Sequence, residues 1–509
     1  MVLIGGEIRG HKIVIGLLEN FTDIWTGHGQ TFRVEAYSPT FIQITSSTDQ
    51  FELTFQSQTG SIRTGKINKN SKNAWVVSCN NRHTIRPCTI WPKIGEKSAD
   101  ILFHLGDQIY ADRVYWRWWR YLSGVPEDKW ELYVPDISKD YFREYYETWE
   151  PLSNILSSTS NIMIPDDHEI KVLAKTWDYL AGGISSEEVT WRSTTEIPTL
   201  VGLFLQDKPT QKEVREKFLL RVALNVCQEL YLGLRLTNRR EFDYFRVING
   251  VSVILAQRIT QPFLGERFMK NFEKFRPQLT SKILWMGGLP PVPVRSNFWE
   301  LFVYRETPEV DDIYYSKFYD KLFEAVGWLT PRSSRRMRSK HCDQEKDCDQ
   351  EENRDQEKDC DQEKHCDQEE NCDQKDCDQK KNCPKRRKNH SNQEKKHYQI
   401  PIDPKIILIG GDLHVGCQGK IYRKGDSNPD HVLTFHISSP SSGFPSAYIP
   451  QDSIDGPQKY QVEIDKYRSS DPNAVWVDFE NYRSRHYFSP GSYADCWQNA
   501  MSTGWVFWT

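Results

Sequence analysis

Four short apolar runs, far apart in the chain, each lead into side chains that are able to bind a metal ion. Each run is too short for an ordinary helix and has polar flanks, which is typical of a buried β-strand. Open α/β sheets place their ligand sites at the carboxyl ends of the strands, so these side chains converge if the strands lie side by side. The groups that follow the runs are Cys79, Asp107 with Tyr110, Asp166 with Asp167 and His168, and Asp412 with His414.

The second of these runs shows why the residue types matter. Gly106 lets the backbone turn sharply at the end of the strand. The two oxygens of Asp107 are able to bridge two cations, and Tyr110 offers a phenolate to a hard, highly charged cation. Taken alone, a Gly-Asp pair is more often a turn or a helix cap, and a Cys such as Cys79 is more often a small buried hydrophobe.

The last two groups are harder to explain without a cation. The adjacent carboxylates of Asp166 and Asp167 repel each other, so they need a cation or hydrogen-bond donors nearby. Asp412 and His414 lie on the same side of an extended segment. All four groups together, in this order, favour a metal site over four unrelated structural roles.

The domain organisation follows from the spacing of apolar residues. A chain of 509 residues suggests two or three domains. Residues 1–70 alternate short apolar and polar stretches, which predicts a small N-terminal all-β domain with a structural or docking role. Beyond residue 73, strands alternate with helical segments, including 138–150, 211–235 and 314–326, which predicts an α/β layer arrangement.

Residues 335–397 are a low-complexity segment inside the second domain, and 341–383 repeat the pattern Cys-Asp-Gln-x-x-x. Almost no aliphatic residue is available for burial there, so we expect a disordered, solvated insertion. The six-residue period does not give the closely spaced Cys pairs typical of zinc sites, which makes metal or thiol chemistry the less favoured interpretation.

The rest of the composition favours a cytoplasmic protein. Glu7, Arg9 and Lys12 interrupt the N-terminal stretch, which lacks the features of a signal peptide. No run approaches the ~18 apolar residues of a membrane span. The net charge of -4 gives no indication of nucleic-acid binding, so we predict no stable nucleic-acid complex. The oligomeric state is left open.

Four motifs in the chain resemble those of one enzyme family. They are Ser78-Cys79, Gly106-Asp107-Gln108-Ile109-Tyr110-Ala111-Asp112, Asp166-Asp167-His168-Glu169 and Gly411-Asp412-Leu413-His414. In this order they resemble the PhoD-like alkaline phosphatase family of the calcineurin-like metallophosphatase superfamily. The resemblance covers residues 71–509 apart from the insertion. It implies a metallophosphatase domain over 71–509, built as a layered β-sandwich flanked by helices.

The resemblance also implies a binuclear metal site. One metal would be held by Cys79, Asp107, Tyr110 and His414, and a second would share Asp107 and add Asp167 and Asp412. A thiolate and a phenolate suit iron(III), whereas an all-oxygen site suits Ca²⁺, Mg²⁺ or Mn²⁺. The resemblance favours iron(III) with Ca²⁺, and the ligands alone also allow Mn²⁺ or Zn²⁺.

The implied activity is hydrolysis of phosphate esters by a metal-bound hydroxide, as a phosphomonoesterase, a phosphodiesterase or both. His168 is the candidate to stabilise charge or protonate the leaving group, beside Asp107 at the metals. Arg113 and Arg117 are the candidates to grip the phosphate, although solvent-exposed arginines would look the same. The alternative is a metal-containing scaffold that binds a partner without turnover. The substrate is left open.

Overall fold

The computed structural model describes most of the chain. The described residues are 1–7, 11–69, 71–80, 89–170, 211–236, 241–257, 259, 266–293, 312–329, 404–412, 416–440, 453–454, 459–469 and 471–489. The predicted insertion at 335–397 and the candidate ligand His414 lie outside these residues. The elements below belong to one compact unit of Met1–Trp328 and Ile400–Thr509.

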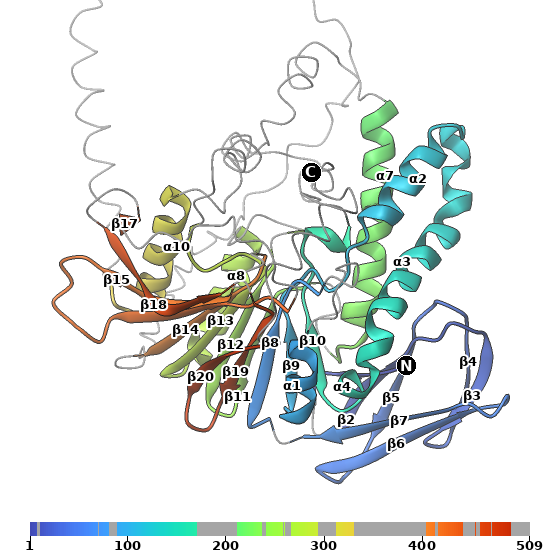
Figure 1. The fold of residues 1–509 in the computed structure, drawn as a ribbon, viewed down its shortest axis with the longest axis horizontal. Helices are drawn as coiled ribbons and strands as arrows, with labels where there is room; N and C mark the ends of the chain where they lie inside the picture. The colour runs from blue at the N-terminus through green and yellow to red at the C-terminus, as the bar shows by residue number, and fades with distance from the viewer. Residues whose placement is uncertain are drawn as a thin grey trace, which may run out of the picture. The chain divides into compact units, whose positions relative to one another are not determined.

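The first of two large sheets carries three of the four predicted site strands (Figure 1). β8, β9, β10 and β1 are parallel neighbours, and antiparallel strands extend both edges. The burial pattern shows every residue of β9 and β10 buried, as expected for strands covered on both faces. The order across the sheet is β20 (Arg483–Phe488), β19 (Asn473–Asp478), β8 (Asn73–Val77), β9 (Ile101–His104), β10 (Ser160–Met163), β1 (Val2–Gly5), β2 (Lys12–Leu17) and β5 (Thr40–Thr45).

The second large sheet carries the fourth site strand, β14. β12, β13, β14 and β16 run parallel, whereas β11 forms a hairpin with β12. Asn249 and Gly250 close that hairpin with φ angles of 46° and 74°, the left-handed pair that a tight hairpin turn favours. The order is β11 (Tyr244–Ile248), β12 (Val251–Ala256), β13 (Lys282–Gly287), β14 (Lys405–Gly410), β16 (Val432–Ile437), β15 (Gly416–Arg423), β18 (Tyr460–Ser469) and β17 (Ser453–Ile454).

The N-terminal segment is all β, as predicted, but its strands are divided between two sheets. β1, β2 and β5 belong to the first large sheet. The other four form a small antiparallel sheet, whose buried residues share a core with β1 and β2. Whether residues 1–70 form a separate domain stays a prediction. The small sheet has the order β4 (Gln30–Val34), β3 (Asp23–Gly27), β6 (Gln50–Ser57) and β7 (Ile62–Asn68).

Helices cover the outer faces of both large sheets, as Figure 1 shows. Trp285 of β13 packs against Phe268 and Phe318, so α8 and α10 cover the second sheet. Trp75 of β8 donates its indole N–H to the carbonyl at the end of α1. The helices are α1 (Ile90–Glu96), α2 (Asp112–Leu122), α3 (Val134–Trp149), α4 (Ser153–Leu156), α7 (Gln211–Cys227), α8 (Glu266–Phe275) and α10 (Asp312–Ala325).

The two large sheets pack face to face around one core. Buried residues of both sheets, such as Val77 and Phe103 of the first and Leu255, Met286 and Ile409 of the second, belong to a single apolar cluster. The fold is therefore a β-sandwich of two mixed sheets flanked by helices, which confirms the predicted fold class. Among the described helices, none is both long and apolar enough to cross a membrane.

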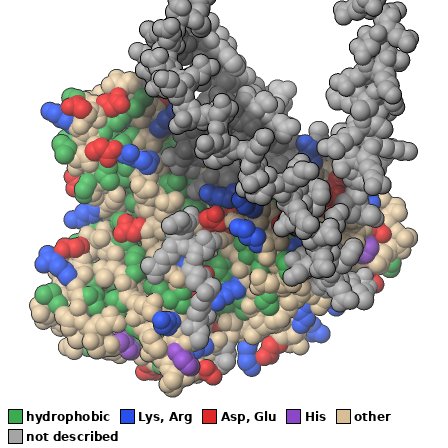
Figure 2. Space-filling view, turned by 180° about the vertical axis from the view of Figure 1, so that it is seen from behind, with side chains coloured by type: hydrophobic (Ala, Val, Ile, Leu, Met, Phe, Trp, Pro, Cys, Tyr) green, Lys and Arg blue, Asp and Glu red, His purple; other side chains and the backbone are tan. Residues whose placement is uncertain are grey.

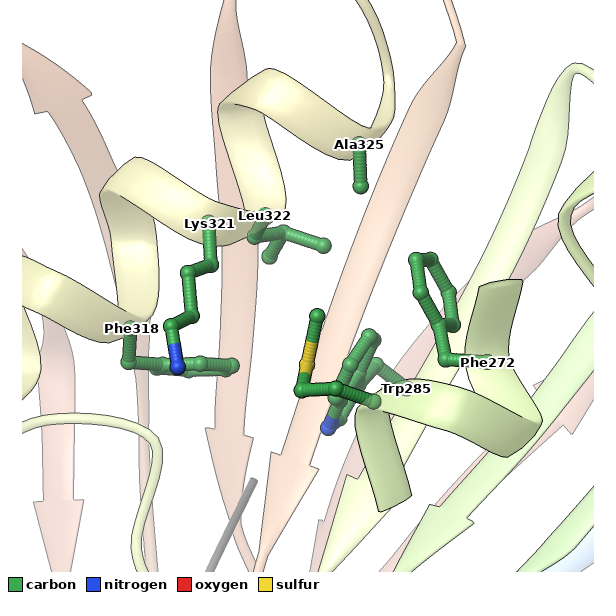
Figure 3. A pocket seen from close by; sticks show the side chains of 7 residues that line it. Phe272, Trp285, Phe318, Lys321, Leu322 and Ala325 are labelled. Atoms are coloured by element: carbon green, nitrogen blue, oxygen red, sulfur yellow. The ribbon is translucent and has the colours of Figure 1, made fainter. Parts of the chain in front are cut away.

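The described surface carries mixed charge and a small apolar pocket. Acidic and basic side chains are interspersed on the described part of the face shown in Figure 2. A small apolar pocket lies between α8, α10 and β13, where Phe272, Trp285 and Phe318 contribute rings and Lys321 extends beside Phe318 (Figure 3). None of the predicted metal ligands lines this pocket, so the site must be sought at the strand ends.

Candidate metal centre

The loops after β8 and β9 are joined by backbone hydrogen bonds. The Cys79 N–H donates to the Gly106 carbonyl at 3.1 Å, and the Asn80 N–H donates to the Asp107 carbonyl at 2.7 Å. Gly106 has φ 95°, and a Cβ on it would lie 2.4 Å from the Cβ of Asp166. The turn at Gly106 thus requires glycine both for its conformation and for space.

The second sheet reaches the same place from the opposite side. Ser78 donates its hydroxyl to the carbonyl of Ser438, which follows β16. A Cβ on Gly411, at the end of β14, would lie only 2.6 Å from the Cβ of Ser78. This close approach of two backbones brings Asp412 to the strand ends that carry Cys79 and Asp107.

The acidic side chains that follow the strands converge. The Sγ atom of Cys79 lies 3.6 Å from Oδ2 of Asp107. Potential ligand atoms of Asp107, Asp167 and His168 all lie within 4.8 Å of one another. Asp166, Asp167 and Asp412 form a second such group, so Asp167 belongs to both.

The backbone is strained at three of these positions. Cys79, Asp107 and Asp412 have φ angles of 52°, 53° and 66°, a region that residues with a Cβ rarely adopt. They are three of only seven non-glycine residues with positive φ in the described chain. Such strain costs on the order of 1–3 kcal/mol per residue and clusters at functional sites, where the surrounding structure enforces it.

Burial and like charge dominate the electrostatics. Burial, with repulsion from carboxylates such as Asp167, raises the pKa of Asp107 well above its usual value. Burial also raises the pKa of the Cys79 thiol, and the charges of Asp107 and Asp412 raise it further. The pKa of Tyr110 is raised for the same reasons.

His168 has an acidic partner that the sequence analysis did not assign. Its Nδ1 lies 2.7 Å from Oδ2 of Asp112, the first residue of α2, and its ring lies 4.2 Å from that of Tyr110. Burial acts to lower the pKa of His168, but Asp107, Asp167 and Asp112 outweigh it and raise the pKa well above its usual value. These carboxylates thus favour the protonated form of the imidazole.

Glu169 connects the loops that carry the acids. Its carboxylate accepts hydrogen bonds from the backbone N–H groups of Asp107, Gln108 and Asp166 and from the hydroxyl of Tyr231. Burial raises the pKa of Glu169 to about 7, although the backbone donors oppose this. The spacing Asp166-x-x-Glu169 is that of a helix capping box, and this signal in the sequence could have identified the contact.

The solved structures that are similar to this chain include two phosphatase-related proteins. One is described as the structure of PhoD; the match has a TM-score of 0.48 and 8% identity and covers 99% of this chain and 98% of that chain. The other is purple acid phosphatase PPD1 from seeds of yellow lupin (Lupinus luteus), with a TM-score of 0.45, 8% identity, and coverage of 97% and 75%. No protein-family model and no curated protein sequence matches. What the centre does chemically must follow from its own side chains.

The structure brings together most of the predicted site residues. Cys79, Asp107, Tyr110, Asp167, His168 and Asp412 lie at one place, whereas His414 is outside the described residues. The sequence analysis assigned no role to Asp112 or Glu169 and did not include Asp166 among the ligands.

Arg113 and Arg117 occupy the exposed side of α2. Arg117 forms an ion pair with Asp140 of α3, so a phosphate would compete with that carboxylate for its guanidinium. Their predicted role at the phosphate stays a prediction.

The donor set fits a metal ion. Several buried carboxylates, an imidazole, a thiol and a phenol face one another, and the raised pKa values of Asp107, Cys79 and Tyr110 have burial and like charge as their causes. A bound cation reverses this situation, because it favours carboxylate, thiolate and phenolate. The acidic groups and His168 are thus candidates to hold a metal, and the metal's identity is a separate question.

Proposed function

We propose that this protein is a metal-dependent hydrolase of phosphate esters of the PhoD-like type. The observation that carries the proposal is the convergence of Asp107, Asp167 and His168 within 4.8 Å, with Cys79 3.6 Å from Asp107. The strained backbone at Cys79, Asp107 and Asp412 supports a functional role, because residues held in this conformation cluster at functional sites.

We assign two metal positions. Cys79, Asp107, Tyr110 and His414 would hold the first, for which a thiol and a phenol favour iron(III). Asp107, Asp167 and Asp412 would hold the second, an oxygen site suited to Ca²⁺ or Mn²⁺. Asp166 lies beside this second position, because its carboxylate is within 4.8 Å of potential ligand atoms of Asp167 and Asp412.

The bound metals would polarise the phosphate ester and lower the pKa of water toward ~7. The chain itself supplies the proton. His168, oriented through Nδ1 by Asp112, presents Nε2 as the general acid that protonates the leaving oxygen. Asp112, which is not among the proposed ligands, is one of the carboxylates that raise the pKa of His168 and so favours the protonated ring that a general acid requires.

The test is metal analysis of the purified protein followed by assays on p-nitrophenyl phosphate and bis(p-nitrophenyl) phosphate with metals titrated. We expect up to two metals per chain and hydrolysis of at least one ester. Asp107→Asn should abolish both the binding of metal and the hydrolysis of the ester. Protein that binds metal but hydrolyses neither ester would support the alternative of a metal-containing scaffold that binds a partner without turnover.

A further inference from the structure

We propose that Glu169 is a positioning residue, whose buried carboxylate sets the loops carrying Asp107 and Asp167 before any metal binds. This inference rests on the proposed function only in so far as it takes the loop residues Asp107 and Asp167 to be metal ligands. The geometry itself belongs to the protein as described, and it is measurable in metal-free protein.

The carboxylate of Glu169 is fully buried and has four hydrogen-bond donors. Oε1 accepts from the Gln108 N–H at 2.7 Å and from the Tyr231 hydroxyl at 2.9 Å. Oε2 accepts from the Asp107 N–H at 2.9 Å and from the Asp166 N–H at 2.8 Å. An ionised carboxylate offers about four acceptor sites, so these donors use its full capacity.

These bonds connect the loop after β9 to the loop after β10. Asp107 and Gln108 lie about 60 positions from Glu169 along the chain, so no local turn holds them together. Asp107 has φ 53°, and a residue keeps this conformation only when its surroundings enforce it. The bond from the Asp107 N–H to Glu169 is part of that enforcement.

A second element supports the carboxylate from behind. α7 ends in a π-helical turn, Gln228–Leu232, which contains Tyr231. The Tyr231 hydroxyl donates to Glu169 and accepts from Tyr145 at 3.1 Å. Turns of this kind are rare and are frequently found at functional sites. Glu169 is thereby fixed against α3 and α7 while its oxygens face the loops.

A glutamine at position 169 has the same shape as the glutamate but cannot accept the same four hydrogen bonds. In Glu169→Gln an NH₂ group replaces one oxygen and faces two donors, because every group bonded to this carboxylate is a donor. At least part of the set is lost whichever way the amide points. Outer-shell partners of metal ligands commonly change metal affinity about 10- to 100-fold.

A matched control lies elsewhere in the chain. Glu19 is also fully buried and fully engaged, because it binds Arg63 through two bonds of 2.8 Å and the N-terminal ammonium. Glu19→Gln therefore tests what the loss of a buried, paired carboxylate does to stability in general. Its partners do not include any candidate ligand.

The experiment compares wild type, Glu169→Gln and Glu19→Gln by hydrogen exchange without metal and by Mn²⁺ titration calorimetry. Both are run well below the unfolding temperature of each variant. We expect Glu169→Gln to accelerate amide exchange around Asp107–Gln108 and Asp166–Asp167 and to weaken Mn²⁺ binding about 10- to 100-fold. Glu19→Gln should lower the unfolding temperature without either effect.

Unchanged exchange in Glu169→Gln overturns the inference, and so does an equal loss of Mn²⁺ affinity in both variants. Wild type that binds no Mn²⁺ counts against the proposed function instead, and the exchange data still decide the role of Glu169. If Glu169→Gln does not fold, Tyr231→Phe removes one donor and should shift exchange at the Gln108 loop in the same direction by a smaller factor. No shift there overturns the inference.

Discussion

Oδ2 of Asp112 lies 2.7 Å from Nδ1 of His168, and this contact joins the first residue of α2 to the loop after β10. The side chain that orients the proposed general acid is therefore carried by the helix that begins just after Tyr110. With Nδ1 committed to Asp112, only Nε2 of His168 is available to the leaving group. The proton on Nε2 depends on the surrounding carboxylates.

We predict that Asp112→Asn lowers the pKa of His168, because it removes one of the carboxylates that raise it. A general acid works only while protonated, so the alkaline limb of the kcat/KM profile should move to lower pH. The rate at its optimum should fall about tenfold, against roughly 10²- to 10⁴-fold for His168→Asn. The exposed acid Asp136 provides a control as Asp136→Asn, and an unmoved alkaline limb in Asp112→Asn would exclude the pairing as functional.

The iron assignment depends on one phenol. If Tyr110 binds iron(III), the isolated protein should show a visible charge-transfer band that disappears in Tyr110→Phe. The buried Tyr141 donates its hydroxyl to the Ile170 carbonyl, so Tyr141→Phe should keep the band. Absorption spectra and metal content measured on the same samples separate a lost ligand from a lost metal. A band that persists in Tyr110→Phe would refute the assignment.

The close approach of the two sheets predicts a packing penalty at Gly411. A methyl group there would meet the Cβ of Ser78 at 2.6 Å, so Gly411→Ala should destabilise the fold by roughly 1–3 kcal/mol. At Gly95 in α1 the nearest atom would be 3.7 Å away, and Gly95→Ala should be neutral or stabilising by up to about 1 kcal/mol. Urea unfolding of both variants gives the comparison, and equal midpoints would contradict it.

A buried histidine of β16 predicts how stability changes with pH. Burial lowers the pKa of His436 to about 4, whereas an unfolded histidine titrates near ~6.5. Between these values the unfolded chain binds the extra proton. The contribution of the neutral His436 ring to the free energy of unfolding is therefore complete above pH ~6.5 and is lost as the pH falls toward 4. The loss amounts to roughly 3 kcal/mol, at about 1.4 kcal/mol per pKa unit.

His436→Gln should flatten the pH dependence of the unfolding free energy between pH 6.5 and 4. The exposed His11 serves as the control, and His11→Gln should leave the slope unchanged. Denaturant titrations at several pH values measure both slopes. Identical slopes for wild type and His436→Gln would show that burial of this ring is not linked to stability.

Deletion of 341–383 tests the compositional prediction for the Cys-Asp-Gln repeat. Because that segment has almost nothing apolar to bury, its removal should change the unfolding midpoint little and leave ester hydrolysis intact. A large loss of either would show that the repeat contributes to folding or to catalysis.

The strands that lead to the centre could be predicted from the sequence alone, because short apolar runs indicate buried strands. β9 and the second half of β10 are apolar, and an acid follows each strand within three residues, so this pattern needs no knowledge of distant residues. The sheets were harder to foresee, since strand pairing depends on partners far along the chain. β1 pairs with β10 and therefore joins the central sheet, which the periodicity of residues 1–70 does not indicate.

The supporting residues were missed for a similar reason. Asp112 and Glu169 act on groups some 60 positions away, and only the folded chain shows these contacts. Tyr231 was predicted correctly to lie in a helix, but a hydrophobic periodicity does not reveal a π turn that directs its hydroxyl to Glu169. The candidate ligands could be predicted from the ends of strands, whereas the side chains that orient them depend on tertiary packing.

The pairing of β19 with β8 has a consequence for biosynthesis. β8 leads directly into Cys79, yet Val475 of β19 is the partner of Val76, so one side of this strand lacks its neighbour until the ribosome has made a segment some 400 residues further along the chain. Contacts between such distant segments form slowly, and unpaired strand edges expose nascent chains to aggregation. The strand that leads into Cys79 therefore gains its second neighbour only after the residues of β19 have been synthesised.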